Sequence, residues 1–346
     1  MKSRFLYTMF SVSALLCTQA MGITISTEGT TDIISGEDSV VVQKDHTVNK
    51  IENSENGTFI NVQANLTVNS DLSVKQISLS QYDKVCSLTV NGNLTLTPNT
   101  KGEGGTLTIA QGESVTVTGT TTLNGWMSQI TKPATLTTGK LVVNNQTSTS
   151  GTIKANEVEV NHTFSLTGGT ISSVDGTAGS FNVNEGGHVW QQGCAVDLDT
   201  VVTGGQMTIY KGSFADLTME DGTLNVRGNF STGNLTLEGG SVIFNEGTGI
   251  DLGGNILTVE DGAVIKLLVT SVDELSDSYT LFKNVGSLAD NLNNLTVIVS
   301  DYEGKNETTM QLTYNNGSVN ATIPEPTTAT LSLLALAALT ARRRRK

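Results

Sequence analysis

The chain of 346 residues is poor in aromatic residues and in the residue types that carry most enzyme chemistry. Aromatic side chains make up 5 % of the sequence, and there are four prolines, three cysteines and three histidines. The histidines, His46, His162 and His188, lie far apart and have no metal-ligand spacing around them. Gly-x-Ser-x-Gly, P-loop and Cys-x-x-Cys motifs are absent. The sequence therefore predicts a non-enzymatic protein with no catalytic residue, no cofactor and no metal site.

Positive charge is scarce between the two ends of the chain. The sequence has 20 lysines and arginines against 33 acidic residues, and seven of these cations lie within 1–22 and 342–346. Without the two ends, 20 − 7 = 13 basic residues remain, which leaves a net charge of about −20. Arg227 is the only arginine in this part. A nucleic-acid partner is excluded, because nothing provides a basic footprint.

Residues 1–22 have the features of an export signal. Lys2 and Arg4 form a basic start, residues 5–16 form an apolar segment too short to span a membrane, and small residues at 18–22 offer a cleavage site. Leu16 is too bulky for lipid attachment at Cys17. We therefore expect the mature chain to begin near residue 23.

Residues 323–346 contain three features in direct succession. A Pro-Glu-Pro tripeptide resists helix formation, the uncharged run 327–341 is rich in leucine and alanine, and a basic cluster closes the chain. The run predicts a short membrane helix of about 22 Å, and the cations keep its far end in the cytoplasm. The residues expected to direct sorting are Pro324, Glu325, Pro326, Arg342, Arg343, Arg344, Arg345 and Lys346.

This segment resembles the PEP-CTERM sorting signal of Gram-negative bacteria, which has the same three parts in the same order. The resemblance implies recognition and cleavage near Pro-Glu-Pro by an exosortase, with the export machinery as a further transient partner. It also implies a protein that is first anchored in the inner membrane and then reaches the outer surface or the medium. Because the family is associated with exopolysaccharide production, an exopolysaccharide or a host glycan is a candidate partner.

Between the ends, short apolar–polar–apolar triplets recur, separated by Gly, Asn, Asp or Thr. Examples are Leu66-Thr67-Val68, Leu88-Thr89-Val90, Leu94-Thr95-Leu96, Leu107-Thr108-Ile109, Val115-Thr116-Val117, Leu217-Thr218-Met219, Leu224-Asn225-Val226, Leu235-Thr236-Leu237 and Val242-Ile243-Phe244. A period of two places the flanking residues on one face and the central residue on the other. This pattern predicts short β-strands with one buried face.

The triplets recur at a spacing of roughly 20 residues, which is in the range of a solenoid repeat. The pairs that show it are Leu217 and Leu235, Leu224 and Val242, Leu88 and Leu107, and Leu94 and Val115, and Glu220-Asp221-Gly222 returns two periods later as Glu260-Asp261-Gly262. Such a period predicts a right-handed parallel β-helix over residues 60–269. Gly, Asn and Asp are expected at its corners, where positive φ is needed. The run of strands resembles autotransporter passengers and pectin-lyase-like β-helices.

An antiparallel β-sandwich is the alternative fold, because some spacings also allow strands every 8–12 residues. The scarcity of large aromatic rings disfavours it. We expect residues 23–59 to cap the N-terminal end and residues 270–322 to form an antiparallel C-terminal cap. Ser271 to Glu274 has the spacing of a capping box that opens a helical turn, and Asn316-Gly317 predicts a hairpin.

The two cysteines of the mature part, Cys86 and Cys194, distinguish the two folds. Their separation in sequence corresponds to roughly five coils at ~20 residues each, which places them about 25 Å apart along a β-helix. A disulfide requires Cα atoms within about 7 Å. We therefore predict two free, inward-facing thiols.

The sequence leaves two functions open. The first is an exported cell-surface or extracellular-matrix structural protein, similar to an adhesin. The alternative is a glycan-binding or polysaccharide-degrading β-helix, although Arg227 lacks the acidic cluster that such lyases use. Trp190 is expected to be half-exposed on a rung of the β-helix, and corner or buried positions are expected for Trp126 and Trp190 rather than a sugar-stacking role. The acidic corners at Glu185, Glu238 and the two Glu-Asp-Gly sites are expected to be ordinary turns.

Overall fold

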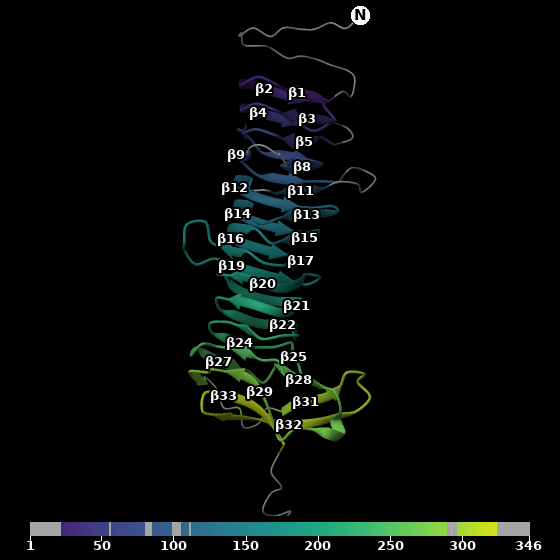
Figure 1. The fold of residues 1–346 in the computed structure, drawn as a ribbon, viewed down its shortest axis with the longest axis vertical. Helices are drawn as coiled ribbons and strands as arrows, with labels where there is room; N and C mark the ends of the chain where they lie inside the picture. Colours follow the sequence, from purple (N-terminus) through teal and green to yellow (C-terminus); the bar gives the residue numbers. More distant parts are fainter. Residues whose placement is uncertain are drawn as a thin grey trace, which may run out of the picture.

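The computed structural model describes residues 22–54, 57–79, 85–98, 105–110, 112–288, 292 and 296–323. The chain forms an elongated all-β rod whose strands run across its long axis (Figure 1). About 12 coils are stacked along this axis, and strands of successive coils pair in parallel. The predicted parallel β-helix is confirmed. The antiparallel sandwich is excluded, because neighbouring strands in the body of the rod run in the same direction.

The strands of the first half of the rod lie between Ile23 and Thr149. They are β1 (Ile23–Ile25), β2 (Gly29–Ser35), β3 (Ser39–Val42), β4 (His46–Glu52), β5 (Phe59–Val62), β6 (Leu66–Val68), β7 (Leu72–Val74), β8 (Gln76–Leu79), β9 (Ser87–Val90), β10 (Leu94–Leu96), β11 (Thr106–Ile109), β12 (Ser114–Leu123), β13 (Met127–Ile130), β14 (Thr135–Val143) and β15 (Gln146–Thr149).

The second half continues the same order to the C-terminal cap. Its strands are β16 (Thr152–Val160), β17 (Thr163–Leu166), β18 (Thr170–Ser172), β19 (Ser180–Asn184), β20 (His188–Val196), β21 (Asp199–Phe214), β22 (Leu217–Val226), β23 (Phe230–Ser231), β24 (Leu235–Leu237), β25 (Ser241–Asn245), β26 (Ile250–Asp251), β27 (Ile256–Val259), β28 (Val264–Val269), β29 (Ser278–Lys283), β30 (Ser287–Leu288), β31 (Thr296–Asp301), β32 (Glu307–Asn315) and β33 (Ser318–Thr322).

The triplets form strands as their pattern predicts. In β6, β10 and β24 the two flanking residues are buried and the central threonine is half-buried. The inward residues of neighbouring coils stack on one another and join into one apolar core that runs from Ile25 to Ala321. Thr suits the outward positions, because a β-branched side chain fits a pleated surface and its hydroxyl can reach water.

The register confirms part of the predicted spacing and corrects the rest. Leu217 pairs with Leu235 and Leu224 with Val242, as their spacing predicts. The predicted pairings of Leu88 with Leu107 and of Leu94 with Val115 are wrong. Leu88 pairs with Val115, and Leu94 pairs with Thr121. The triplet at Leu107 belongs to β11, which pairs with β8 and β13 on another side of the rod. A coil carries more than one strand, so equal spacing does not ensure pairing.

Glycines occupy corners where a side chain has no room. Gly222 has φ +93°, and a Cβ at this position would lie 2.2 Å from the carbonyl oxygen of Gly205 on the preceding coil. Asn284 and Asn316 are the described non-glycine residues with positive φ. Both lie after residue 269, so within the described coils of 60–269 glycine alone takes positive φ. The expectation is confirmed for Gly, and for Asn and Asp at these corners it is wrong.

Residues 23–59 form coils of the same kind as the rest of the rod. Strand β1 pairs in parallel with β3, and β2 pairs in parallel with β4. Both lie at the N-terminal end of the rod in Figure 1. The stretch expected as an N-terminal cap therefore has the parallel strand arrangement of the coils that follow it.

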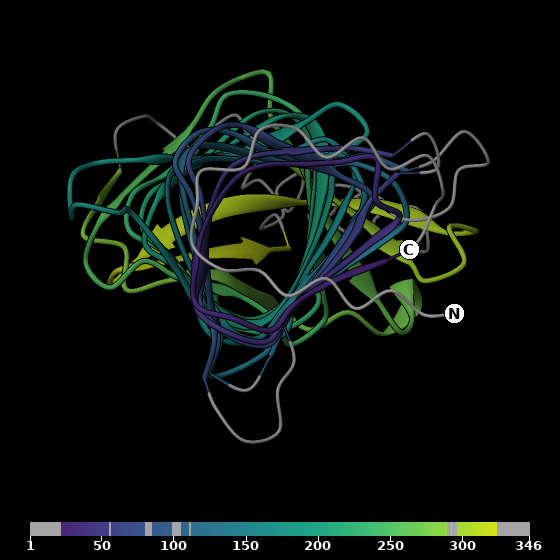
Figure 2. The ribbon, with the colours of Figure 1, turned by 90° about the horizontal axis from the view of Figure 1, so that it is seen from above.

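The C-terminal end is closed by antiparallel strands. β33 pairs with β29 and β32, and β32 pairs with β31, all antiparallel. Seen along the axis, β32 and β33 cross the end of the coil cross-section (Figure 2). Asn316 and Gly317 have φ +48° and +75° in the predicted hairpin. Val272–Glu274 forms the predicted helical turn, a 3₁₀ turn, but the Ser271 side chain makes no capping bond, so the capping-box prediction is wrong in that detail.

The two cysteines are free and buried, as predicted. The Cys86 thiol donates to the carbonyl oxygen of Val62 at 3.2 Å. Burial is the main cause that raises the pKa of each thiol to about 12. Since the thiolate is the reactive form, both cysteines are inert core residues at neutral pH.

Candidate functional site

The residues expected to direct sorting lie outside the described residues. They are Pro324, Glu325, Pro326, Arg342, Arg343, Arg344, Arg345 and Lys346. Residues 1–21 of the expected export signal also lie outside them. Among the helices of the part that is described, none has the length and apolar character needed to cross a membrane.

The three histidines have separate environments. His46 is buried, with Nε2 2.8 Å from the Thr31 hydroxyl and Nδ1 3.2 Å from the carbonyl oxygen of Thr27. His162 is exposed, and its Nδ1 accepts a hydrogen bond from the backbone of Thr163 at 2.8 Å. His188 is half-buried on the outer face of β20. The structure therefore does not assemble them into a shared site.

Acidic residues stack on one corner of the rod. Met219, Leu237 and Val259 pair in register on three successive coils, and each is followed directly by an exposed glutamate, at positions 220, 238 and 260. No three acidic, histidine or cysteine side chains within the described ranges lie close enough together to hold a metal ion. The carboxylates form a solvated ridge along the corner.

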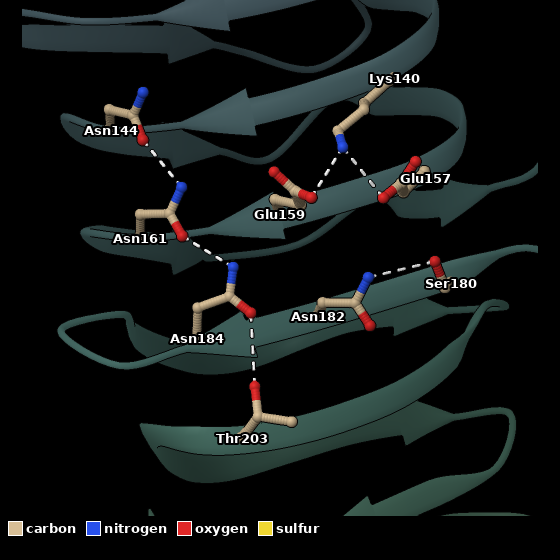
Figure 3. Close-up of polar contacts among 9 residues, drawn as sticks. All are labelled: Lys140, Asn144, Glu157, Glu159, Asn161, Ser180, Asn182, Asn184 and Thr203. Atoms are coloured by element: carbon tan, nitrogen blue, oxygen red, sulfur yellow. Dashed lines mark hydrogen bonds and ion pairs between the residues drawn. The ribbon is translucent and has the colours of Figure 1, made fainter.

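A ladder of asparagines crosses several coils in the middle of the rod (Figure 3). Asn144 donates to Asn124 at 2.9 Å, Asn161 donates to Asn144 at 2.8 Å, and Asn184 donates to Asn161 at 2.8 Å. The Thr203 hydroxyl lies 3.4 Å from the Asn184 carbonyl oxygen and extends the ladder. Asn144, Asn161 and Asn184 each act as both donor and acceptor, so the ladder ties successive coils together.

A second ladder, of one aspartate and three asparagines, lies at the N-terminal end. Asn49 donates to Asp32, Asn69 to Asn49, and Asn91 to Asn69, each at 3.0 Å. Beside it, one outward position is threonine on six successive coils in register: Thr30, Thr47, Thr67, Thr89, Thr116 and Thr137. This face of the rod therefore presents the same hydroxyl on coil after coil.

Lys140 forms an ion-pair cluster next to the asparagine ladder. Its ammonium lies 2.7 Å from Glu159 and 3.0 Å from Glu157 on the next coil (Figure 3). The hydrogen bond to Glu159 is the main cause that raises the pKa of Lys140 above its ordinary value, and the bond to Glu157 adds to it. The group is partly exposed, so it contributes modestly to stability.

Ring side chains gather on the outer face of β20 and β21. The His188 and Trp190 rings have centroids 4.8 Å apart, and Trp190 and Tyr210 have centroids 6.4 Å apart with an interplanar angle of 14°. His188 also lies 3.3 Å from the Thr208 hydroxyl, and burial lowers the pKa of its imidazole. Trp190 is half-buried and Tyr210 is 43 % exposed.

An open hollow of about 430 Å³ adjoins this cluster. His188 is one of its lining residues, together with Thr163, Gly186, Gly187, Gly204, Gly205, Gln206, Gly222 and Thr223. The glycines lie at the corner where neighbouring coils approach closely. A Cβ at Gly187 would lie 2.2 Å from the carbonyl oxygen of Val160, and one at Gly205 would lie 2.6 Å from that of Asn184.

The two tryptophans differ in their surroundings. Trp126 is 70 % exposed between β12 and β13, and no ring stacks on it in the described part of the chain. The sequence indicates a half-exposed Trp190 but not its neighbour Tyr210. The signal that could have found Tyr210 is its place in the sequence, about one coil after Trp190.

Comparison of the chain with protein-family models, with curated proteins and with solved structures finds no match.

Proposed function

We propose that the protein is an exported structural protein of the cell surface or extracellular matrix, a rigid adhesin-like stalk that is not an enzyme. The observation that carries this proposal is the continuous rod. About 12 coils share one apolar core, and hydrogen-bonded ladders tie neighbouring coils together on the outside. Each coil contacts its neighbours along the whole stack. Such a rod can hold its free end at a distance from the cell surface.

The sequence supports a route to the surface. Residues 1–22 have the composition of an export signal, and residues 323–346 resemble a PEP-CTERM signal. In this proposal the basic cluster stops transfer in the inner membrane, and an exosortase then cuts near Pro324–Pro326. The net charge of about −20 after removal of both ends, from 13 basic and 33 acidic residues, favours a soluble product.

Cell fractionation combined with mass spectrometry of the mature termini tests the proposal. We expect the protein in the envelope or the medium, with an N-terminus between residues 21 and 23 and a C-terminus near Pro324–Pro326. A variant in which Arg342–Lys346 are replaced by Ser and Gln should keep the first cleavage and lose the second. A protein that stays in the cytoplasm with both ends intact would contradict the proposal.

A further inference from the structure

We propose that the outer face of β20 to β22 binds a neutral polysaccharide. In this site Trp190 and Tyr210 stack against sugar rings, and His188 and Gln206 exchange hydrogen bonds with sugar hydroxyls. The biological role of such binding rests on the proposed function as an exported stalk, but the site itself can be tested on the isolated protein.

The two rings provide the apolar part of the site. Their planes are nearly parallel, and Tyr210 comes from the coil that follows Trp190 but lies two positions further along its strand. A chain running obliquely across β20 and β21 would therefore meet both rings. No partner within the described chain bonds to the indole N–H of Trp190 or the hydroxyl of Tyr210. Aromatic faces carry negative potential and attract the C–H bonds of a pyranose, while the polar ends of the rings remain for hydroxyl groups.

The hollow provides the polar part of the site. Its lining offers the His188 imidazole, the Gln206 amide and the hydroxyls of Thr163 and Thr223. Its volume is about 430 Å³, and it is open to solvent rather than enclosed like a typical small-molecule site. Such sites for apolar ligands are lined mainly by apolar side chains, whereas glycines and polar groups predominate here. The lining therefore favours a ligand rich in hydroxyl groups.

The charges around the hollow favour a neutral ligand. Apart from the imidazole, none of the lining residues is ionisable. Two acidic residues border it. The Cβ of Glu185 would lie 3.6 Å from a Cβ placed on Gly204. The carboxylate of Asp221 accepts a hydrogen bond from the backbone N–H of Gly222 at 2.6 Å. These carboxylates and the net charge of −13 repel acidic polymers at the hollow. Two cations lie at the other end of the site: Lys211 follows Tyr210, and the backbone N–H of Arg227 bonds to the carbonyl oxygen of Ile209 directly before it.

Affinity electrophoresis of the full chain in detergent tests this inference. Native gels would contain hydroxyethylcellulose, dextran or glucomannan as neutral probes and polygalacturonate as an acidic one. We expect at least one neutral probe to retard the protein and polygalacturonate not to. Trp190→Ala and Tyr210→Ala should each weaken the binding about tenfold or more, which is typical of aromatic residues at the centre of an interface.

Trp126→Ala is the matched control, because it removes the other tryptophan from a different part of the surface. Trp190→Phe is the second control, because it keeps a ring and should keep most of the affinity. Thermal unfolding of each variant shows whether it is folded. Binding that Trp190→Ala and Trp126→Ala reduce equally, or no retardation by any neutral probe, would overturn the inference and leave the proposal of an exported stalk untouched.

Discussion

At the scale of single residues, the coils are held in place by groups that repeat from one coil to the next. Asn161 shows this most clearly, because it donates to Asn144 on one neighbouring coil and accepts from Asn184 on the other. Glycine has the complementary role at the corners. At Gly222 any side chain would collide with the backbone of the preceding coil. Amide ladders therefore link coils where side chains fit, and glycines permit close contact where they do not.

Asn161→Ala should destabilise the protein by about 1–2 kcal/mol, because it removes two hydrogen bonds between coils, one to the exposed Asn144 and one from the half-buried Asn184. Asn182→Ala is the matched control. Asn182 is also half-buried, but its side chain bonds to Ser180 within the same strand (Figure 3). Its replacement should cost about 0.5 kcal/mol or less. Urea unfolding measures both, and equal losses would show that the ladder does not link the coils.

At the scale of strands and coils, the sequence predicts where a strand lies better than which strand it pairs with. Triplets such as Leu235-Thr236-Leu237 form strands at the predicted positions, because a period of two is a local property. The predicted partner of Leu88 is wrong, because the coils differ in length. The chain from Leu88 to its partner Val115 is much longer than that from Leu136 to its partner Ile153. Which strands pair depends on the number of residues in each corner, and the local alternation of residues does not reveal that number.

The same limit applies to the candidate site. The half-exposure of Trp190 follows from the alternation of residues along β20. Its contact with Tyr210 depends on the register of β20 with β21, in which Trp190 lies opposite Thr208 and Tyr210 lies two positions further along. The hollow depends on glycines from three coils meeting at one corner. These features arise from the stacking of coils, so the sequence alone does not reveal them.

The C-terminal cap lends itself to a test at this scale. Leu312 is buried in β32, and Leu312→Asp would place a charge in the core at a cost of about 3–5 kcal/mol. We expect the cap to detach and expose the edges of β29 and β31, which should cause self-association. Light scattering should detect the aggregates. Thr313→Asp, on the exposed side of the same strand, is the matched control and should remain monomeric; aggregation of both variants, or of neither, would contradict this role of the cap.

At the scale of the whole molecule, the proposals depend on an extended, rigid rod. About 12 coils at about 4.8 Å each give a stack of about 58 Å before side chains and the cap are added. A stalk needs this length, and a polysaccharide that contacts β20 and β21 together needs coils that keep their register. The six threonines in register, from Thr30 to Thr137, occupy the N-terminal half of this length.

Small-angle X-ray scattering of residues 22–323 tests the rod most directly. We expect a distance distribution with a maximum at a short distance and a long tail, and a maximum dimension clearly above about 60 Å. A compact sphere of about 300 residues has a radius of gyration of about 19 Å, which corresponds to a diameter of about 50 Å. A symmetric distribution that ends near that diameter would contradict the β-helical rod and both functions proposed for it.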